Sequence, residues 1–125
     1  MKKVNVGIVG CGNISGIYLT NLTGMFADKV NVVAVCDLIP EKALAAQKKY
    51  NIPKAYFTDE EIMADSEIEL IVNITTPDQH CIINMMALEA GKHAYCEKPL
   101  AICREDGEKQ VHLAKEKGLL LGGAP

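Results

Sequence analysis

The sequence contains no tryptophan, and only 5% of its 125 residues are aromatic, so a hydrophobic core must be built from aliphatic side chains. It has no excess of basic residues either, because 13 Lys and Arg stand against 16 Asp and Glu, for a formal net charge of −3. General nucleic-acid binders carry a basic face, so this class is not favoured. Apolar residues at 49% and charged residues at 23% are ordinary globular values, which excludes a wholly disordered chain.

Long apolar runs are also absent from the chain. No stretch approaches the roughly 18 consecutive apolar residues of a membrane-spanning helix, and the first residues do not resemble a secretory signal. The cysteines are odd in number and form no C-x-x-C pair, which argues against a metal site or a disulfide framework. We therefore expect free thiols in a reducing cytoplasm, with no metal, membrane or nucleic-acid partner.

Short apolar runs rich in β-branched residues alternate along the chain with segments of helical periodicity. The apolar runs predict strands at residues 4–9, 30–36, 68–74, 94–96 and 119–121. The periodic segments predict helices at residues 14–25, 40–50, 58–63, 77–90 and 104–117. This alternation predicts an α/β fold in three layers, with a doubly wound parallel sheet of strand order 3-2-1-4-5-6.

A glycine-rich turn links the first predicted strand to the first predicted helix. It reads Gly10-Cys11-Gly12-Asn13-Ile14-Ser15, the G-x-G-x-x-small pattern of dinucleotide-binding turns. Gly10 would permit the tight turn, Gly12 would let the backbone approach a pyrophosphate, and the helix N-terminus would offer N–H groups to it. We expect Cys11 to be a small turn residue, although a helix N-terminus can activate a thiol. The alternative is a tight turn without a ligand.

An acidic residue, Asp37, ends the second predicted strand. An acidic residue at this place in a dinucleotide-binding fold accepts hydrogen bonds from the adenosine ribose hydroxyls of NAD. Its charge should repel a 2′-phosphate, and the next residue, Leu38, supplies no cation to bind one. The sequence therefore favours NAD over NADP. The alternative is a turn or helix-capping aspartate before Pro40.

Two further polar segments follow predicted strands. Residues 73–80 (Asn-Ile-Thr-Thr-Pro-Asp-Gln-His) come after the strand at 68–74, and Glu97-Lys98-Pro99 comes after the strand at 94–96. Open α/β sheets bind ligands at the carboxyl ends of their strands. Four loops at one edge would then carry a phosphate-binding turn, a carboxylate, hydroxyls with an imidazole, and an ammonium.

Together these segments resemble the glucose-fructose oxidoreductase/inositol dehydrogenase family, often written Gfo/Idh/MocA. The resemblance runs from residue 4 to about residue 123, and its most specific part is Ala90-Gly91-Lys92-His93 followed by Glu97-Lys98-Pro99. It implies that residues 1–125 form the cofactor-binding domain of a two-domain oxidoreductase. In this family a second domain supplies most of the substrate pocket, the usual catalytic histidine and commonly the oligomer interface.

The resemblance implies reversible hydride transfer between a sugar or polyol carbon and the nicotinamide. Lys98 would be catalytic, polarising the reacting hydroxyl and helping to move its proton. We also expect a cis peptide bond between Lys98 and Pro99. The implied cofactor contacts are Asn13 and Ile14 at the pyrophosphate, Glu97 at the loop or the nicotinamide ribose, and Thr75, Thr76, Pro77 and His80 at the nicotinamide end.

Other interpretations of these residues stay open. Lys98 could be a solvated turn lysine, and His80 a partly exposed side chain bonded to the backbone. A second hypothesis for the whole chain is a sensor or regulatory module that binds NAD(H) without chemistry, and Lys98 distinguishes the two. A nucleotide-site methyltransferase is a third, against which the Glu-Lys-Pro segment argues.

The chain stops directly after the last predicted strand, at Gly122-Gly123-Ala124-Pro125. A loop of the ligand-binding crevice should begin there, so we expect the chain to be a piece of a longer protein that turns over no substrate alone. Uncovered strands and apolar faces tend to pair, and we therefore expect self-association through the edge after Leu121.

Overall fold

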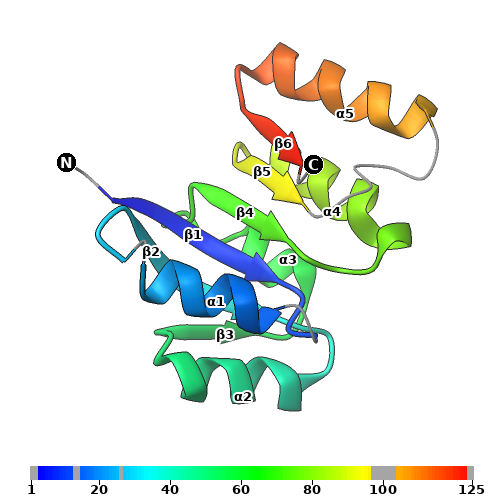
Figure 1. Cartoon of the computed structure of the whole chain (residues 1–125). Helices are drawn as coiled ribbons and strands as arrows, with labels where there is room; N and C mark the ends of the chain where they lie inside the picture. The colour runs from blue at the N-terminus through cyan, green and yellow to red at the C-terminus, as the bar shows by residue number, and fades with distance from the viewer. Residues whose placement is uncertain (1–2, 13–14, 26, 97–103, 124–125) are drawn as a thin grey trace.

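Six parallel strands form a single sheet between two layers of helices in the computed structural model (Figure 1), which describes residues 3–12, 15–25, 27–96 and 104–123. The strands are β1 (Val4–Val9), β2 (Val30–Cys36), β3 (Lys54–Tyr56), β4 (Leu70–Asn73), β5 (His93–Cys96) and β6 (Leu121–Gly123). The helices are α1 (Ser15–Thr23), α2 (Pro40–Tyr50), α3 (Asp59–Met63), α4 (Pro77–Glu89) and α5 (Arg104–Lys117).

The strand order is β3-β2-β1-β4-β5-β6, so the predicted doubly wound topology is confirmed. No apolar run in the sequence had marked β3. This edge strand has only three residues, all of them half-buried, and it pairs with β2 alone. A short strand with one neighbour buries too little apolar surface to leave a clear pattern in the sequence.

The core is aliphatic and lies on both faces of the sheet. One cluster joins the sheet to α3, α4 and α5, through Ile62, Ile83 and Ala114 among others. The other joins it to α1 and α2, through Leu19 and Ala46. Both faces of β1 and β2 are therefore covered, which explains why these strands read as nearly continuous apolar runs.

Helix termini follow the signals in the sequence. Thr58 and Glu61 form a capping box, because the Thr58 side chain accepts from the Glu61 N–H at 3.2 Å and the Glu61 carboxylate accepts from the Thr58 N–H at 3.1 Å. Helix α4 begins at Pro77 and is followed by Gly91 with a φ of 82°, a conformation that glycine adopts readily. None of the described helices combines the length and apolar character that a membrane crossing needs.

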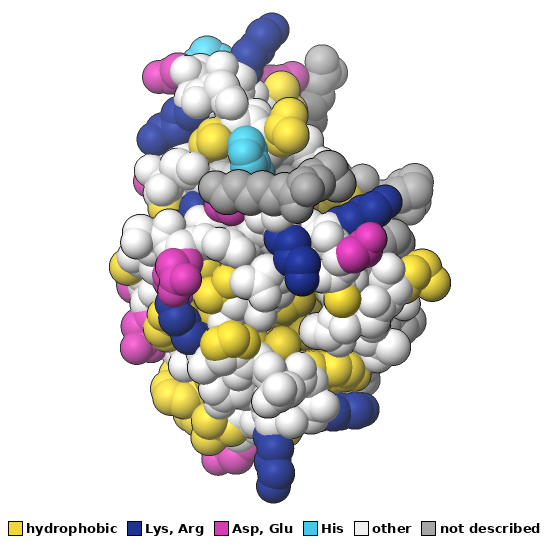
Figure 2. Space-filling view, turned by 90° about the vertical axis from the view of Figure 1, so that its left-hand side faces the viewer, with side chains coloured by type: hydrophobic (Ala, Val, Ile, Leu, Met, Phe, Trp, Pro, Cys, Tyr) yellow, Lys and Arg dark blue, Asp and Glu magenta, His cyan; other side chains and the backbone are white. Residues whose placement is uncertain are grey.

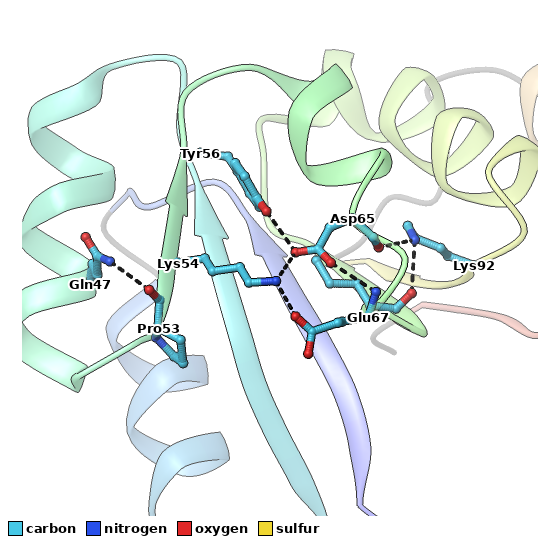
Figure 3. A network of polar contacts seen from close by, with 8 residues as sticks. Gln47, Pro53, Lys54, Tyr56, Asp65, Glu67 and Lys92 are labelled. Carbon is cyan, nitrogen blue, oxygen red and sulfur yellow. Dashed lines mark hydrogen bonds and ion pairs between the residues drawn. The ribbon is translucent and has the colours of Figure 1, made fainter.

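A polar network holds the segment that precedes β4 in place (Figure 3). The Lys54 ammonium pairs with the carboxylates of Asp65, at 2.9 Å, and Glu67, and the Tyr56 hydroxyl donates to Asp65 at 2.8 Å. The buried Lys92 ammonium donates to the Asp65 carbonyl at 2.8 Å. Since Lys54 begins β3 and Lys92 precedes β5, the network lies at the amino ends of these parallel strands, opposite the glycine-rich turn.

One part of the sheet is left open on the α1 side. A hollow of about 570 Å³ lies over β4, β5 and β6 and has mostly apolar walls, which include Leu22, Tyr95 and Leu121. Among the described helices, α4 and α5 cover the opposite face of these strands, and α1 packs over β2 (Figure 1).

Figure 2 looks onto the amino ends of the strands, where apolar side chains gather between charged ones.

Candidate functional site

The first position of the turn after β1 has a backbone conformation that only glycine fits. Gly10 has a φ of 102°, and a β-carbon there would lie 2.8 Å from the carbonyl oxygen of Ile74, which is closer than real β-carbons approach. Its N–H donates to the Cys36 carbonyl at 2.8 Å, so the turn is held between the ends of β2 and β4. At Gly12, a β-carbon would meet no atom within 4 Å. This leaves the backbone of the turn open to a ligand.

Asp37 follows β2 and holds this turn in place. One carboxylate oxygen accepts from the Cys11 N–H at 2.8 Å, and the other accepts from the Ile39 N–H at 2.9 Å. Asp37 therefore has the turn role that the sequence left open as an alternative. Each carboxylate oxygen can accept a second hydrogen bond, so the side chain keeps acceptor capacity for a ligand hydroxyl.

A cavity of about 580 Å³ lies over the carboxyl ends of β1, β2 and β4. It brings together the predicted site residues Gly10, Gly12, Asp37, Thr75 and Thr76, which come from three separate loops. The described residues of its wall are Val9, Gly10, Gly12, Asp37, Leu38, Ile39, Lys42, Asp59, Ile74, Thr75, Thr76, Gln79 and Ile83. Apolar walls with a few polar groups are typical of a cofactor site.

Two charged residues of this wall were missed by the sequence reasoning. Lys42 lies in the first turn of α2 and lines the same cavity as Asp37, so a cation is present although Leu38 supplies none. Asp59 begins α3, and burial raises its pKa, as do the charges of Glu60 and Asp37. One sequence signal could have revealed Lys42. It lies just after a predicted helix start, and Asp37 precedes that start.

Cys11 lies half-buried within the glycine-rich turn. Its thiol donates to the Cys36 carbonyl at 3.6 Å. Burial raises the pKa of the Cys11 thiol to about 12, and the neighbouring Asp37 carboxylate contributes to the shift. A thiol of this kind stays protonated at neutral pH, so Cys11 has the properties of a turn residue and not those of an activated nucleophile.

The segment after β4 divides into an exposed part and a buried part. Thr75 and Thr76 line the cavity, and Pro77 is the first residue of α4. His80 is only 1% exposed, and its Nε2 lies 2.9 Å from the Thr75 carbonyl oxygen. His80 is thus bonded to the backbone, as the alternative interpretation had it, but it is buried and not partly exposed.

Five residues singled out in the sequence lie outside the described residues: Asn13, Ile14, Glu97, Lys98 and Pro99. The Lys98–Pro99 peptide bond, expected to be cis, lies outside them as well. The residue that precedes this last segment, Cys96, is buried at the end of β5. Because parallel strands end at one edge, β5 leads the chain toward the edge that carries the cavity.

The geometry of this edge agrees with the comparison to protein families. The Gfo/Idh/MocA model, described as "Oxidoreductase family, NAD-binding Rossmann fold", matches residues 4–123. The chain belongs to this family. The resemblance drawn from the sequence motifs is therefore confirmed, and the chain is a NAD-binding Rossmann domain of the oxidoreductase family.

Two curated relatives are inositol dehydrogenases by name. Inositol 2-dehydrogenase of Salmonella typhimurium is 32% identical over 116 residues, which cover 92% of this chain and 34% of that protein. Inositol 2-dehydrogenase/D-chiro-inositol 3-dehydrogenase of Lactiplantibacillus plantarum is 40% identical over 113 residues, covering 85% of this chain and 32% of that protein. The chain thus spans about a third of the length of the curated relatives it matches.

Among solved structures, the WlbA dehydrogenase from Bordetella pertussis in complex with NADH and UDP-GlcNAcA superimposes with a TM-score of 0.92 at 28% identity. The match covers 98% of this chain and 37% of that one. The fold described here is therefore also found in a dehydrogenase that holds NADH.

Proposed function

We propose that this chain is the cofactor-binding domain of a dehydrogenase that transfers a hydride between NAD and a sugar- or polyol-type alcohol. The observation that carries the proposal is the single cavity that unites the Gly12 turn with the Asp37 carboxylate. The polyol substrate class is supported by the names of the inositol dehydrogenases among the relatives. Bound NAD would supply the hydride chemistry, and the residues of this chain would bind and orient it.

The order of the strands matches the order of groups in a dinucleotide. Asp37 follows β2, the glycine-rich turn follows β1, and Thr75 follows β4, so these three sites lie side by side along one edge. An extended dinucleotide would place its adenosine ribose at Asp37 and its pyrophosphate over Gly12, with the backbone of Asn13 and Ile14 at the start of α1. Its nicotinamide end would lie toward Thr75, Thr76 and Pro77.

The balance between Asp37 and Lys42 would set the choice between NAD and NADP. The carboxylate accepts from ribose hydroxyls and repels a 2′-phosphate, which favours NAD. Lys42 lines the same cavity and would attract that phosphate if the carboxylate were removed. NAD is therefore the preferred cofactor of the unmodified chain.

Lys98 would handle the proton of the reaction. As the hydroxyl carbon of the substrate loses its hydride, the hydroxyl proton must leave, and an amine beside the positively charged nicotinamide has a lowered pKa suited to accept it. Glu97 would support the loop or contact the nicotinamide ribose.

Titration calorimetry of this chain with NAD, NADP and ADP-ribose tests the proposal. We expect NAD to bind more tightly than NADP, and we expect no turnover of polyols by the chain alone, because most of the substrate pocket would come from a second domain. A chain that bound none of the three ligands at millimolar concentration would contradict the proposed function. Tighter binding of NADP than of NAD would contradict the role given to Asp37.

A further inference from the structure

Three fully buried amide side chains connect the end of β4 to α5. Asn73 ends β4, Asn84 lies on α4 and Gln110 lies on α5, and each has an exposed fraction of 0%. The Asn73 amide nitrogen donates to the Asn84 oxygen at 2.9 Å, and the Asn84 nitrogen donates to the Gln110 oxygen at 2.8 Å. Burying amides in an otherwise aliphatic core is costly unless they are paired, so this chain of amides specifies one arrangement of the three elements.

Backbone carbonyls at both ends fix the direction of these hydrogen bonds. The Asn73 nitrogen also donates to the His80 carbonyl at 3.0 Å, and the Gln110 nitrogen donates to the Asp106 carbonyl at 3.3 Å. A carbonyl oxygen only accepts, so the atoms that face these two carbonyls must be the NH₂ groups. The amide oxygen of Asn73 is therefore the atom that faces Thr75.

The direction of the hydrogen bonds among the three amides determines what the Thr75 hydroxyl can do. Its oxygen lies 2.6 Å from the Asn73 oxygen, which has no proton to give, so the Thr75 hydroxyl must donate to Asn73. The Thr75 N–H reaches the same oxygen at 3.3 Å. With its only proton held there, the Thr75 hydroxyl can offer a ligand nothing but lone pairs. It can accept from a hydroxyl, and it cannot donate to a phosphate oxygen.

Thr75 also lies on the far side of the glycine-rich turn from Asp37. It lines the cavity after β4, whereas Asp37 lines it after β2, and β1 with its turn lies between these strands. Resting on the proposed binding of NAD, we propose that the Thr75 hydroxyl is an acceptor for a hydroxyl group of the second ribose, the one next to the nicotinamide. The Asn73–Asn84–Gln110 amide chain would act through Thr75 as a positioning device for this contact.

Calorimetric titration of the full chain with NAD, ADP-ribose and AMP tests the proposal, since AMP lacks the second ribose. Thr75→Val keeps the shape of the side chain and removes the acceptor, so NAD and ADP-ribose should bind about three- to tenfold more weakly, the usual effect of one lost hydrogen bond, with AMP unchanged. Thr75→Ser should bind all three ligands as the unmodified chain does. Thr20→Val, on the exposed surface of α1, is the control for replacing a threonine hydroxyl.

A double-mutant cycle tests the amide chain. Asn84→Leu removes one acceptor of the Asn73 amide nitrogen and leaves the His80 carbonyl, so it should weaken ADP-ribose binding less than Thr75→Val does, and the double variant should bind no more weakly than Thr75→Val. Circular dichroism checks that Asn84→Leu is folded, and Thr75→Val decides the proposal where it is not. Unchanged ADP-ribose binding by Thr75→Val, or an equal weakening of AMP, would overturn the inference while leaving the proposed function intact. If the unmodified chain bound none of the ligands, the proposed function would itself fail, and this inference with it.

Discussion

The carboxylate of Asp37 and the backbone N–H of Cys11 lie 2.8 Å apart, which ties the end of β2 to the glycine-rich turn after β1. The other carboxylate oxygen accepts from the Ile39 N–H, so one side chain orders both loops. A residue that holds its own binding site together affects stability as well as affinity.

Asp37→Ala should destabilise the chain by about 1–3 kcal/mol, because two backbone N–H groups lose a charged acceptor. Urea unfolding followed by circular dichroism measures the change. Asp37→Asn retains one acceptor oxygen and should lose less. If Asp37→Ala were as stable as the unmodified chain, the two hydrogen bonds would have no structural weight.

Cofactor preference should change with the same residue. Asp37→Ala removes a ribose acceptor from NAD and a repulsive charge from the site of a 2′-phosphate, so it should weaken NAD more than NADP. Adding Lys42→Ala should then weaken NADP, because Lys42 lines the same cavity and supplies the cation. Calorimetry of the single and double variants with both cofactors measures this. If the NADP affinity were equal with and without Lys42, this residue would have no role in the choice of cofactor.

The thiol of Cys11 should react slowly with thiol reagents. Its pKa is raised to about 12 from an ordinary 9.0, so near pH 8 very little thiolate is present, and alkylation should be more than about tenfold slower than for an exposed cysteine. The rate should rise with pH, and Asp37→Asn should increase it by removing a charge that opposes ionisation. Mass spectrometry after timed exposure to iodoacetamide resolves the site. Rapid labelling of Cys11 in the unmodified chain would contradict the prediction.

Asp65 should contribute to acid sensitivity. Burial alone would raise its pKa, but hydrogen bonds from Lys54, from the Glu67 N–H and from Tyr56 outweigh burial and lower the pKa below its ordinary 3.8. A carboxylate with a lowered pKa in the folded state stabilises the fold above the unfolded value, and this contribution is lost as pH falls below about 4. Asp65→Asn should therefore lose less stability than the unmodified chain when urea midpoints at pH 7 and pH 3 are compared. Asp28→Asn, at an exposed position, is the control.

The open face over β4, β5 and β6 should drive self-association of this chain. Its hollow has mostly apolar walls, and β6 is an edge strand. Leu121→Lys should reduce association in sedimentation velocity runs at high concentration. Ile82→Lys replaces an exposed apolar side chain on α4, away from this face, and should leave association unchanged. A strictly monomeric unmodified chain would contradict the prediction.

The topology could be predicted from the sequence because buried parallel strands and amphipathic helices leave local patterns. Gly10, Asp37 and Thr75 could be assigned to one edge for the same reason, since each follows a predicted strand. Lys42 and Gln110 could not be placed in this way. Gln110 reads as a solvent-facing helix residue until one of its partners, Asn84 on another helix, is known.

The buried side chain of Lys92 belongs to the most specific sequence motif of this chain. Its ammonium donates to the carbonyls of Asp65 and Ile68, ahead of β4, and takes no part in the cavity wall of the described residues. The structure therefore gives Lys92 a role in holding the fold. A homologous chain could keep it and still lack Lys98, the lysine that we propose as catalytic. Sequence searches that score this motif would recover such an inactive chain as readily as an enzyme.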